Sequence, residues 1–65
     1  MAQINGEYFH ISEPLTVAVF LEERNINRDT VAVELNGEIL PKDSFGTVYI
    51  KDSDTVEIVN FVCGG

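Results

Sequence analysis

Cysteine, basic residues and long apolar runs are all scarce in this chain of 65 residues. Its single cysteine, Cys63, cannot form an internal disulfide, so the composition favours a reducing compartment, and we expect the cytoplasm. No apolar run approaches the roughly 20 residues that cross a membrane, and the N-terminal residues do not read as a secretory signal. With 45% hydrophobic residues the chain is too apolar for a disordered tail, so we expect one small globular domain.

Basic residues number four against eleven acidic ones, which gives a formal net charge of −7. Such a chain repels phosphate backbones and anionic lipid, so neither nucleic acid nor a membrane is an expected partner. The acidic surface either serves solubility alone or steers the protein toward a partner with a basic docking face.

Motifs that bind nucleotides or perform catalysis are also missing from the sequence. There is no glycine-rich phosphate loop and no Ser, His and Asp constellation, so we expect no bound cofactor and no catalysis by the chain itself. Asp52 and Asp54 resemble the first two ligands of a calcium loop, but its downstream glycine and bidentate glutamate are absent. No metal site is predicted.

What the sequence does contain begins with a hairpin signal at Asn5-Gly6. Asn-Gly between apolar segments predicts a two-residue type I′ turn, because both turn positions need positive φ. The turn pairs Ile4 with Glu7 and so fixes the register of the two strands. The residues expected to face the core are Ala2, Ile4, Phe9 and Ile11, while Tyr8 and His10 face the other side.

The segment after Pro14 fits two periodicities. Its apolar residues alternate as in a strand from 15 to 21, but the spacing of Val17, Phe20 and Leu21 also fits a helix. We favour the helix, because Thr16 is a sound N-cap and Leu15 can pack against Phe20 as a hydrophobic staple. Residues 25–27 would end this helix.

A second hairpin follows the helix. Val31 to Leu35 predicts a strand, Asn36-Gly37 a second tight turn, and residues 38–40 the return strand. Residues 41–45 suit an irregular turn, residues 46–50 a short edge segment, and residues 51–54 a polar turn.

The last predicted strand runs from Thr55 to Phe61. Val56 and Ile58 fall on one face, which would pack under the helix, and this leaves Val59 and Phe61 pointing outward. Two exposed apolar residues at this place suggest a docking patch for a partner. The alternatives are that the strand is covered on both faces or that the alternation slips at Asn60.

The sequence ends in Gly64-Gly65. Two residues without a Cβ put the least bulk beside a carboxylate, so this peptide can enter a narrow passage and bring the carboxyl carbon to another reactant. Cys63 is either a compact tail residue or a second thiol that forms a thioester or acyl disulfide with the terminus.

Two hairpins around one helix, with the last strand inside a mixed sheet of four or five strands, are typical of the α+β, ubiquitin-like β-grasp fold. Over nearly its full length the chain resembles the ThiS family, the sulfur carriers of thiamine thiazole synthesis. The matching segments are Asn5-Gly6, Leu15-Thr16-Val17, residues 33–41 (VELNGEILP), residues 51–59 (KDSDTVEIV) and Gly64-Gly65.

The resemblance implies a carrier protein and not an enzyme: a single domain, 1–65, with a globular head at 1–61 and a flexible tail at 62–65. A ThiF-like adenylyltransferase would use ATP and Mg²⁺ to activate the carboxylate of Gly65, and Gly64 would give the tail its flexibility. Sulfur from a cysteine desulfurase would leave a thiocarboxylate, and a ThiG-like thiazole synthase would accept it. The residues expected to contact partners are Val59, Phe61, Val62 and Cys63.

Three other functions share some of these features. A MoaD-like carrier for molybdopterin, or a carrier for tRNA thiolation or cysteine synthesis, has the same fold and terminus. A ubiquitin-like modifier would join its terminus to target lysines. An acidic binding module would have incidental terminal glycines, and deleting Gly65 would then leave its activity intact.

Overall fold

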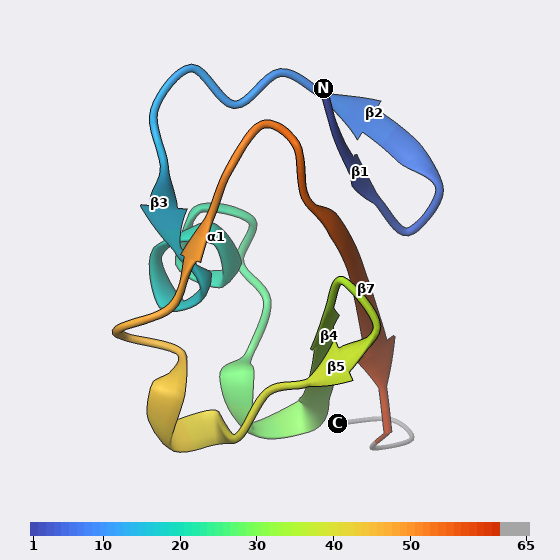
Figure 1. The fold of residues 1–65 in the computed structure, drawn as a ribbon. Helices are drawn as coiled ribbons and strands as arrows, with labels where there is room; N and C mark the ends of the chain where they lie inside the picture. Colours follow the sequence, from blue (N-terminus) through green and yellow to red (C-terminus); the bar gives the residue numbers. More distant parts are fainter. Residues whose placement is uncertain (62–65) are drawn as a thin grey trace.

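Asn-Gly turns shape both hairpins of the structure, a computed structural model that describes residues 1–61 (Figure 1). Strands β1 (Ala2–Ile4) and β2 (Glu7–Phe9) pair antiparallel in the predicted register, with φ of 51° at Asn5 and 85° at Gly6. Strands β4 (Val31–Leu35) and β5 (Glu38–Ile39) pair in the same way around the second Asn-Gly turn. Both predicted hairpins are confirmed.

The main sheet is mixed and has the strand order β2-β1-β7-β4-β5. Its centre is β7 (Thr55–Asn60), which runs parallel to β1 and antiparallel to β4. This confirms the prediction of a mixed four- or five-stranded sheet with the last strand inside it. The strand ends one residue earlier than predicted, although the backbone N–H of Phe61 still donates to the carbonyl of Thr30 at 3.0 Å.

Helix α1 (Val17–Glu23) begins as predicted, because the Thr16 hydroxyl accepts a hydrogen bond from the N–H of Val19 at 3.2 Å. The two residues before it form β3 (Leu15–Thr16), which pairs antiparallel with β6 (Tyr49–Ile50) as a second, two-stranded sheet. The sequence did not predict this small sheet. The expected edge segment at 46–50 is a strand only over its last two residues, and it does not join the main sheet.

Two short 3₁₀ helices lie in the segments that connect the larger elements. One, η1 (Arg28–Thr30), leads into β4; the other, η2 (Lys42–Ser44), lies within the predicted turn at 41–45. This turn carries Phe45 into the core with 1% of its surface exposed. The prediction of an irregular turn was therefore wrong, because a buried phenylalanine fixes the conformation of this segment.

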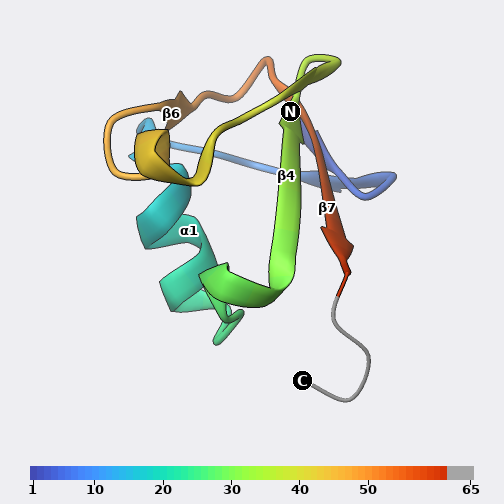
Figure 2. The same ribbon diagram turned by 90° about the horizontal axis from the view of Figure 1, so that it is seen from below.

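The core lies between α1 and one face of the main sheet, and Figure 2 shows the helix on that side only. Ala2 and Ile4 are buried as predicted, while Phe9 and Ile11 are half-buried. Within residues 1–61, no helix is long and apolar enough to cross a membrane. The cluster of buried core residues is Ile4, Val17, Phe20, Leu21, Val31, Val33, Phe45, Ile50 and Val56. No helix or strand within residues 1–61 covers the opposite face of the sheet.

Candidate functional site

The last strand, β7, places alternate side chains on the two faces of the sheet, as the sequence predicts. Val56 is fully buried and Ile58 half-buried on the helix side, whereas Val59 and Phe61 are 57% and 62% exposed. Val59 lies opposite Ala32 of β4 in the ladder. The alternatives of a doubly covered strand and of a slip at Asn60 are therefore wrong.

The other predicted site residues are Val62, Cys63, Gly64 and Gly65, and they lie outside the residues that the structure describes. Their predicted roles stay predictions. What the structure adds is the support from which they extend: β7 is hydrogen-bonded to a neighbouring strand on each side.

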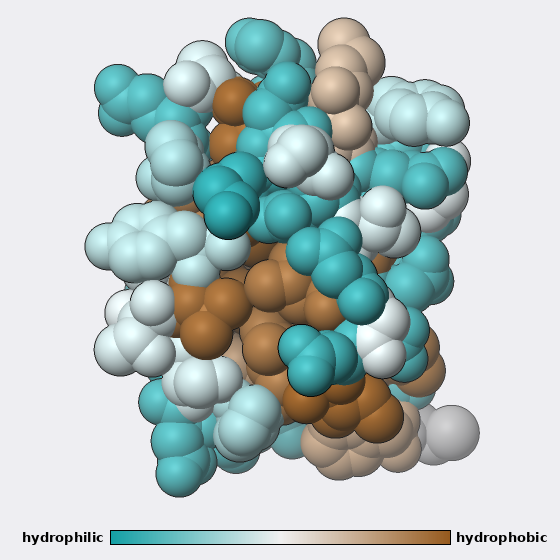
Figure 3. Space-filling model, in the orientation of Figure 1, coloured by the Kyte–Doolittle hydropathy of each residue, from teal (hydrophilic) through white to brown (hydrophobic). Residues whose placement is uncertain are grey.

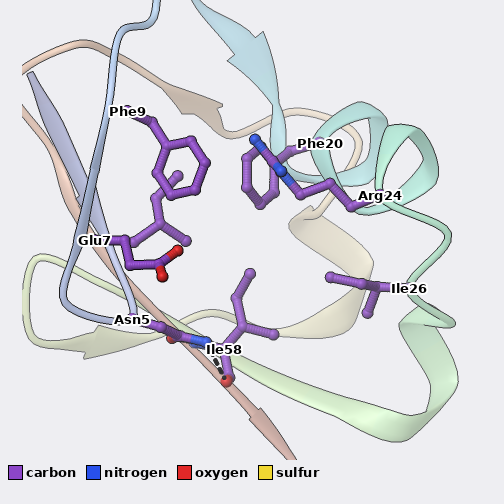
Figure 4. Close-up of a pocket in the computed structure, with 8 residues that line it drawn as sticks. Asn5, Glu7, Phe9, Phe20, Arg24, Ile26 and Ile58 are labelled. Carbon is purple, nitrogen blue, oxygen red and sulfur yellow. Dashed lines mark hydrogen bonds between the residues drawn. The ribbon is translucent and has the colours of Figure 1, made fainter.

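Asn5 fastens the end of this strand to the first hairpin. Its side-chain oxygen accepts from the N–H of Ile58 at 2.7 Å, and its side-chain nitrogen donates to the carbonyl of Ile58 at 3.2 Å (Figure 4). The side-chain amide of Asn5 thereby makes with Ile58 the two hydrogen bonds that the backbone of a strand residue would make, although β1 ends at Ile4. Sequence reasoning assigned Asn5 only to the turn, because nothing in the pattern reveals a contact over 53 residues.

The uncovered face of the sheet contains more than Val59 and Phe61. Tyr8 pairs with Gln3 and is 69% exposed, and Ile39 pairs with Glu34 and is 73% exposed. Figure 3 shows hydrophobic side chains at the surface over the region of β4, β5 and the end of β7. We call Tyr8, Glu34, Ile39, Glu57, Val59 and Phe61 the outer face. Alternation along each strand had placed Glu34 and Glu57 on this side, but the sequence analysis gave neither a role and did not single out Ile39.

A hollow of about 210 Å³ lies on the other side of the sheet, between the first hairpin and the end of α1 (Figure 4). The guanidinium of Arg24 lies 4.5 Å from the ring centroid of Phe9 and 4.6 Å from that of Phe20, so it is already held between two rings. This hollow is lined by Ile4, Asn5, Glu7, Phe9, Phe20, Arg24, Ile26 and Ile58. Arg24 is thus engaged in the contact between the first hairpin and the helix.

Two carboxylates elsewhere have altered proton affinity. A hydrogen bond from the N–H of Ile11 at 2.8 Å lowers the pKa of Asp52, and the N-terminal amine and His10 add to this. A hydrogen bond and the charge of Lys42 lower the pKa of Asp29. Asp54, which the sequence offered as a calcium ligand, is buried and accepts from Asn36 and from the N–H of Lys51. Among the described residues, no group of three or more metal-ligating side chains exists.

Comparison with known proteins supports one family. A model of the ThiS family matches residues 2–65. The sulfur carrier protein ThiS of Bacillus subtilis (strain 168) is 35% identical over 66 residues, covering 100% of both chains. A thiazole synthase of Paramagnetospirillum magneticum is 45% identical over 62 residues, which cover 95% of this chain but 19% of that protein.

A solved structure agrees with these matches. The crystal structure of a thiamine biosynthesis protein (ThiS) from Geobacter metallireducens has a TM-score of 0.79 and 34% identity, covering 98% of this chain and 97% of the other. The likeness confirms the predicted β-grasp fold.

Proposed function

Because the chain belongs to the ThiS family, we propose that it is a sulfur carrier of thiamine biosynthesis whose Gly65 carboxylate is converted to a thiocarboxylate. The observation that carries the proposal is the family match, which runs through residue 65 and so includes Gly64 and Gly65. The fold adds support, because the central strand β7 leads directly toward these residues.

The chemistry explains why the carrier needs an activating partner. An α-carboxylate has a pKa of about 3.3 to 3.7, so it is ionised at neutral pH and is a poor acyl electrophile. A ThiF-like adenylyltransferase joins the Gly65 carboxylate to the AMP of ATP and releases pyrophosphate. Mg²⁺ and the nucleotide belong to that partner, and this chain is its co-substrate.

Sulfur enters in the second stage. The terminal sulfur of a desulfurase persulfide attacks the acyl carbon, displaces AMP and forms an acyl disulfide. A thiol then attacks the desulfurase sulfur of that S–S bond, is oxidised to a disulfide with it, and releases the thiocarboxylate. A ThiG-like thiazole synthase accepts this sulfur. The Paramagnetospirillum thiazole synthase supports this acceptor, because a segment resembling this chain is part of a protein with that name.

The head supplies recognition during both stages. Val59 and Phe61 are exposed apolar residues on and just beyond β7, immediately before the tail. We assign them to docking, since a few residues that become buried at a protein interface contribute most of its binding energy. Gly64 keeps the tail narrow where it enters the partner's site.

Intact-protein mass spectrometry tests the proposal. The chain is incubated with a ThiF-like enzyme, ATP, Mg²⁺, cysteine and a desulfurase, and its mass is expected to rise by one sulfur minus one oxygen. A variant lacking Gly65 is expected to gain nothing. An isopeptide product with lysine would instead identify a modifier, and sulfur transfer to a molybdopterin precursor but not to a thiazole precursor would identify a MoaD-like carrier. Normal transfer by Cys63→Ser would exclude a covalent role for that thiol.

A further inference from the structure

The outer face carries two glutamates directly opposite each other. Glu34 of β4 pairs with Glu57 of β7 in the antiparallel ladder. Both lie on the face away from α1, because the preceding residues Val33 and Val56 are buried on the helix side. The Cβ atoms of directly opposite residues lie roughly 4.5–5.5 Å apart, and like charges in these positions repel each other.

The described basic side chains do not neutralise this pair. Arg24 lies between two phenylalanine rings, Arg28 lies over the ring of Phe45, and Lys42 forms an ion pair with Asp29. Lys51, the fourth basic residue, takes part in none of the ion pairs found within residues 1–61. Within residues 1–61, the ion pairs involve Asp29 and Asp52 as the acidic partners. Within residues 1–61 neither glutamate therefore has a basic partner, and Glu57 is exposed while Glu34 is half-buried.

Apolar side chains surround this charge. Ile39, which lies across from Glu34, is 73% exposed, and Val59, the next residue of β7 on this face, is 57% exposed. Phe61 continues the apolar surface toward the tail and is 62% exposed. A partner that covers these side chains removes water from the glutamates as well, so it must supply a positive charge at that point.

A second copy of this chain does not fit the surface. Its net charge of −7 would repel another copy, and a symmetric contact through this face would bring two glutamate pairs together. The occupant is therefore a different protein with an apolar surface around a basic side chain.

We propose that Glu34 and Glu57 together receive one arginine side chain of the adenylating partner, and that this contact selects the partner. A guanidinium has five N–H donors in a planar fork, so it can bind two neighbouring carboxylates at once, which a lysine ammonium does less well. Because that partner must hold ATP, a polyanion, it carries basic groups, and its field attracts an acidic head. The inference rests on the proposed function and deepens it.

Neutralising each glutamate separately tests the assignment. Glu34→Gln and Glu57→Gln keep the shape of the side chain and remove its charge. Each is expected to raise the KM for adenylation by the purified ThiF-like enzyme roughly tenfold, the range for a lost charge-assisted hydrogen bond, while kcat changes little. Each is also expected to raise the melting temperature of the free protein, because the repulsion across the ladder disappears.

Glu38→Gln is the matched control. Glu38 lies on neighbouring β5, is exposed, and pairs with Leu35, so it does not belong to the outer face. The substitution changes the net charge by the same amount, so it measures general electrostatic steering alone. Equal KM values for the Glu38, Glu34 and Glu57 variants would overturn the proposal. So would a lower melting temperature for the Glu34 and Glu57 variants, which would indicate a structural role.

The same assay separates this inference from the proposed function. If the unaltered chain gains no sulfur at Gly65, the proposed function fails. If it gains sulfur and both glutamate variants react with the unaltered KM, only the arginine contact fails. A defect confined to sulfur delivery by the thiazole synthase would overturn the assignment to the adenylating partner.

Discussion

Two asparagine side chains in this small protein make hydrogen bonds of the kind that backbone groups make between strands. Asn36 holds the second hairpin to the start of β7: its side-chain oxygen accepts from the N–H of Thr55 at 2.9 Å, and its side-chain nitrogen donates to Asp54 at 3.0 Å. Asn5 does the same near the other end of that strand. Both residues also adopt positive φ, so each one forms part of a tight turn and holds its hairpin to β7 through its side chain. This dual use follows from the amide, which has a donor and an acceptor on one short side chain.

At the residue scale, we expect Asp52 to make the stability of the protein depend on pH. Its pKa is lowered, chiefly by the hydrogen bond from Ile11, so its stabilising contribution is present above the ordinary aspartate pKa of about 3.9. That contribution is lost as the pH falls through the lowered value. We therefore expect the stability difference between the unaltered protein and Asp52→Asn to shrink from about pH 6 to about pH 2 in urea titrations.

His10→Gln serves as the control for this measurement. His10 lies 3.7 Å from Asp52, and its substitution leaves the bond from Ile11 in place. The acid-dependent loss should persist in this variant. A difference between Asp52→Asn and the unaltered protein that stays constant over the whole range would contradict the explanation.

Elements differed in how well the sequence predicted them. The hairpins were predicted because Asn-Gly fixes both the turn type and the register, and the helix because Thr16 supplies a cap. The pairing of β3 with β6 was missed, since each strand has two residues and they pair across more than 30 positions. For the same reason Glu34 could not be matched with Glu57: their pairing is set by the ladder between β4 and β7, not by any local pattern. Val59 and Phe61 were found because alternation along one strand is local.

The contact between hairpin and helix depends on Arg24. Replacing it with alanine removes the cation held between Phe9 and Phe20, and we expect a loss of about 1 kcal/mol in the free energy of unfolding. Hydrogen exchange should also become faster at the amides of β2. Arg24→Lys keeps the charge without the flat guanidinium and should lose less. Equal stability of all three proteins would show that the stacking contributes nothing.

At the scale of the whole molecule, the two faces of the sheet differ in burial. One face packs on α1 and supplies the core, while the outer face carries exposed apolar and acidic side chains. Changes on the outer face should therefore affect binding more than folding, because exposed positions contribute little to the core.

The double variant Val59→Thr and Phe61→Thr examines this separation. Threonine keeps a branched side chain suited to a strand, so we expect the free energy of unfolding to change by about 0.5 kcal/mol or less. The KM for adenylation should rise at least about tenfold, since anchor residues at interfaces contribute 2 kcal/mol or more. Val19→Thr, at an exposed position of α1, is the control and should react normally. A large loss of stability without a change in KM would assign Val59 and Phe61 to folding.

The central position of β7 also determines how the molecule bears force. Under the proposed function, a partner that pulled on the residues after Phe61 would load β7 along the strand axis. The hydrogen bonds to β1 and β4 then share this load in shear, because they lie across the direction of pulling and cannot open one after another. A strand at the edge of the sheet would peel away more easily. The head could therefore stay folded under such tension, and the force would be transmitted through the ladder between β7 and β4 to the outer face.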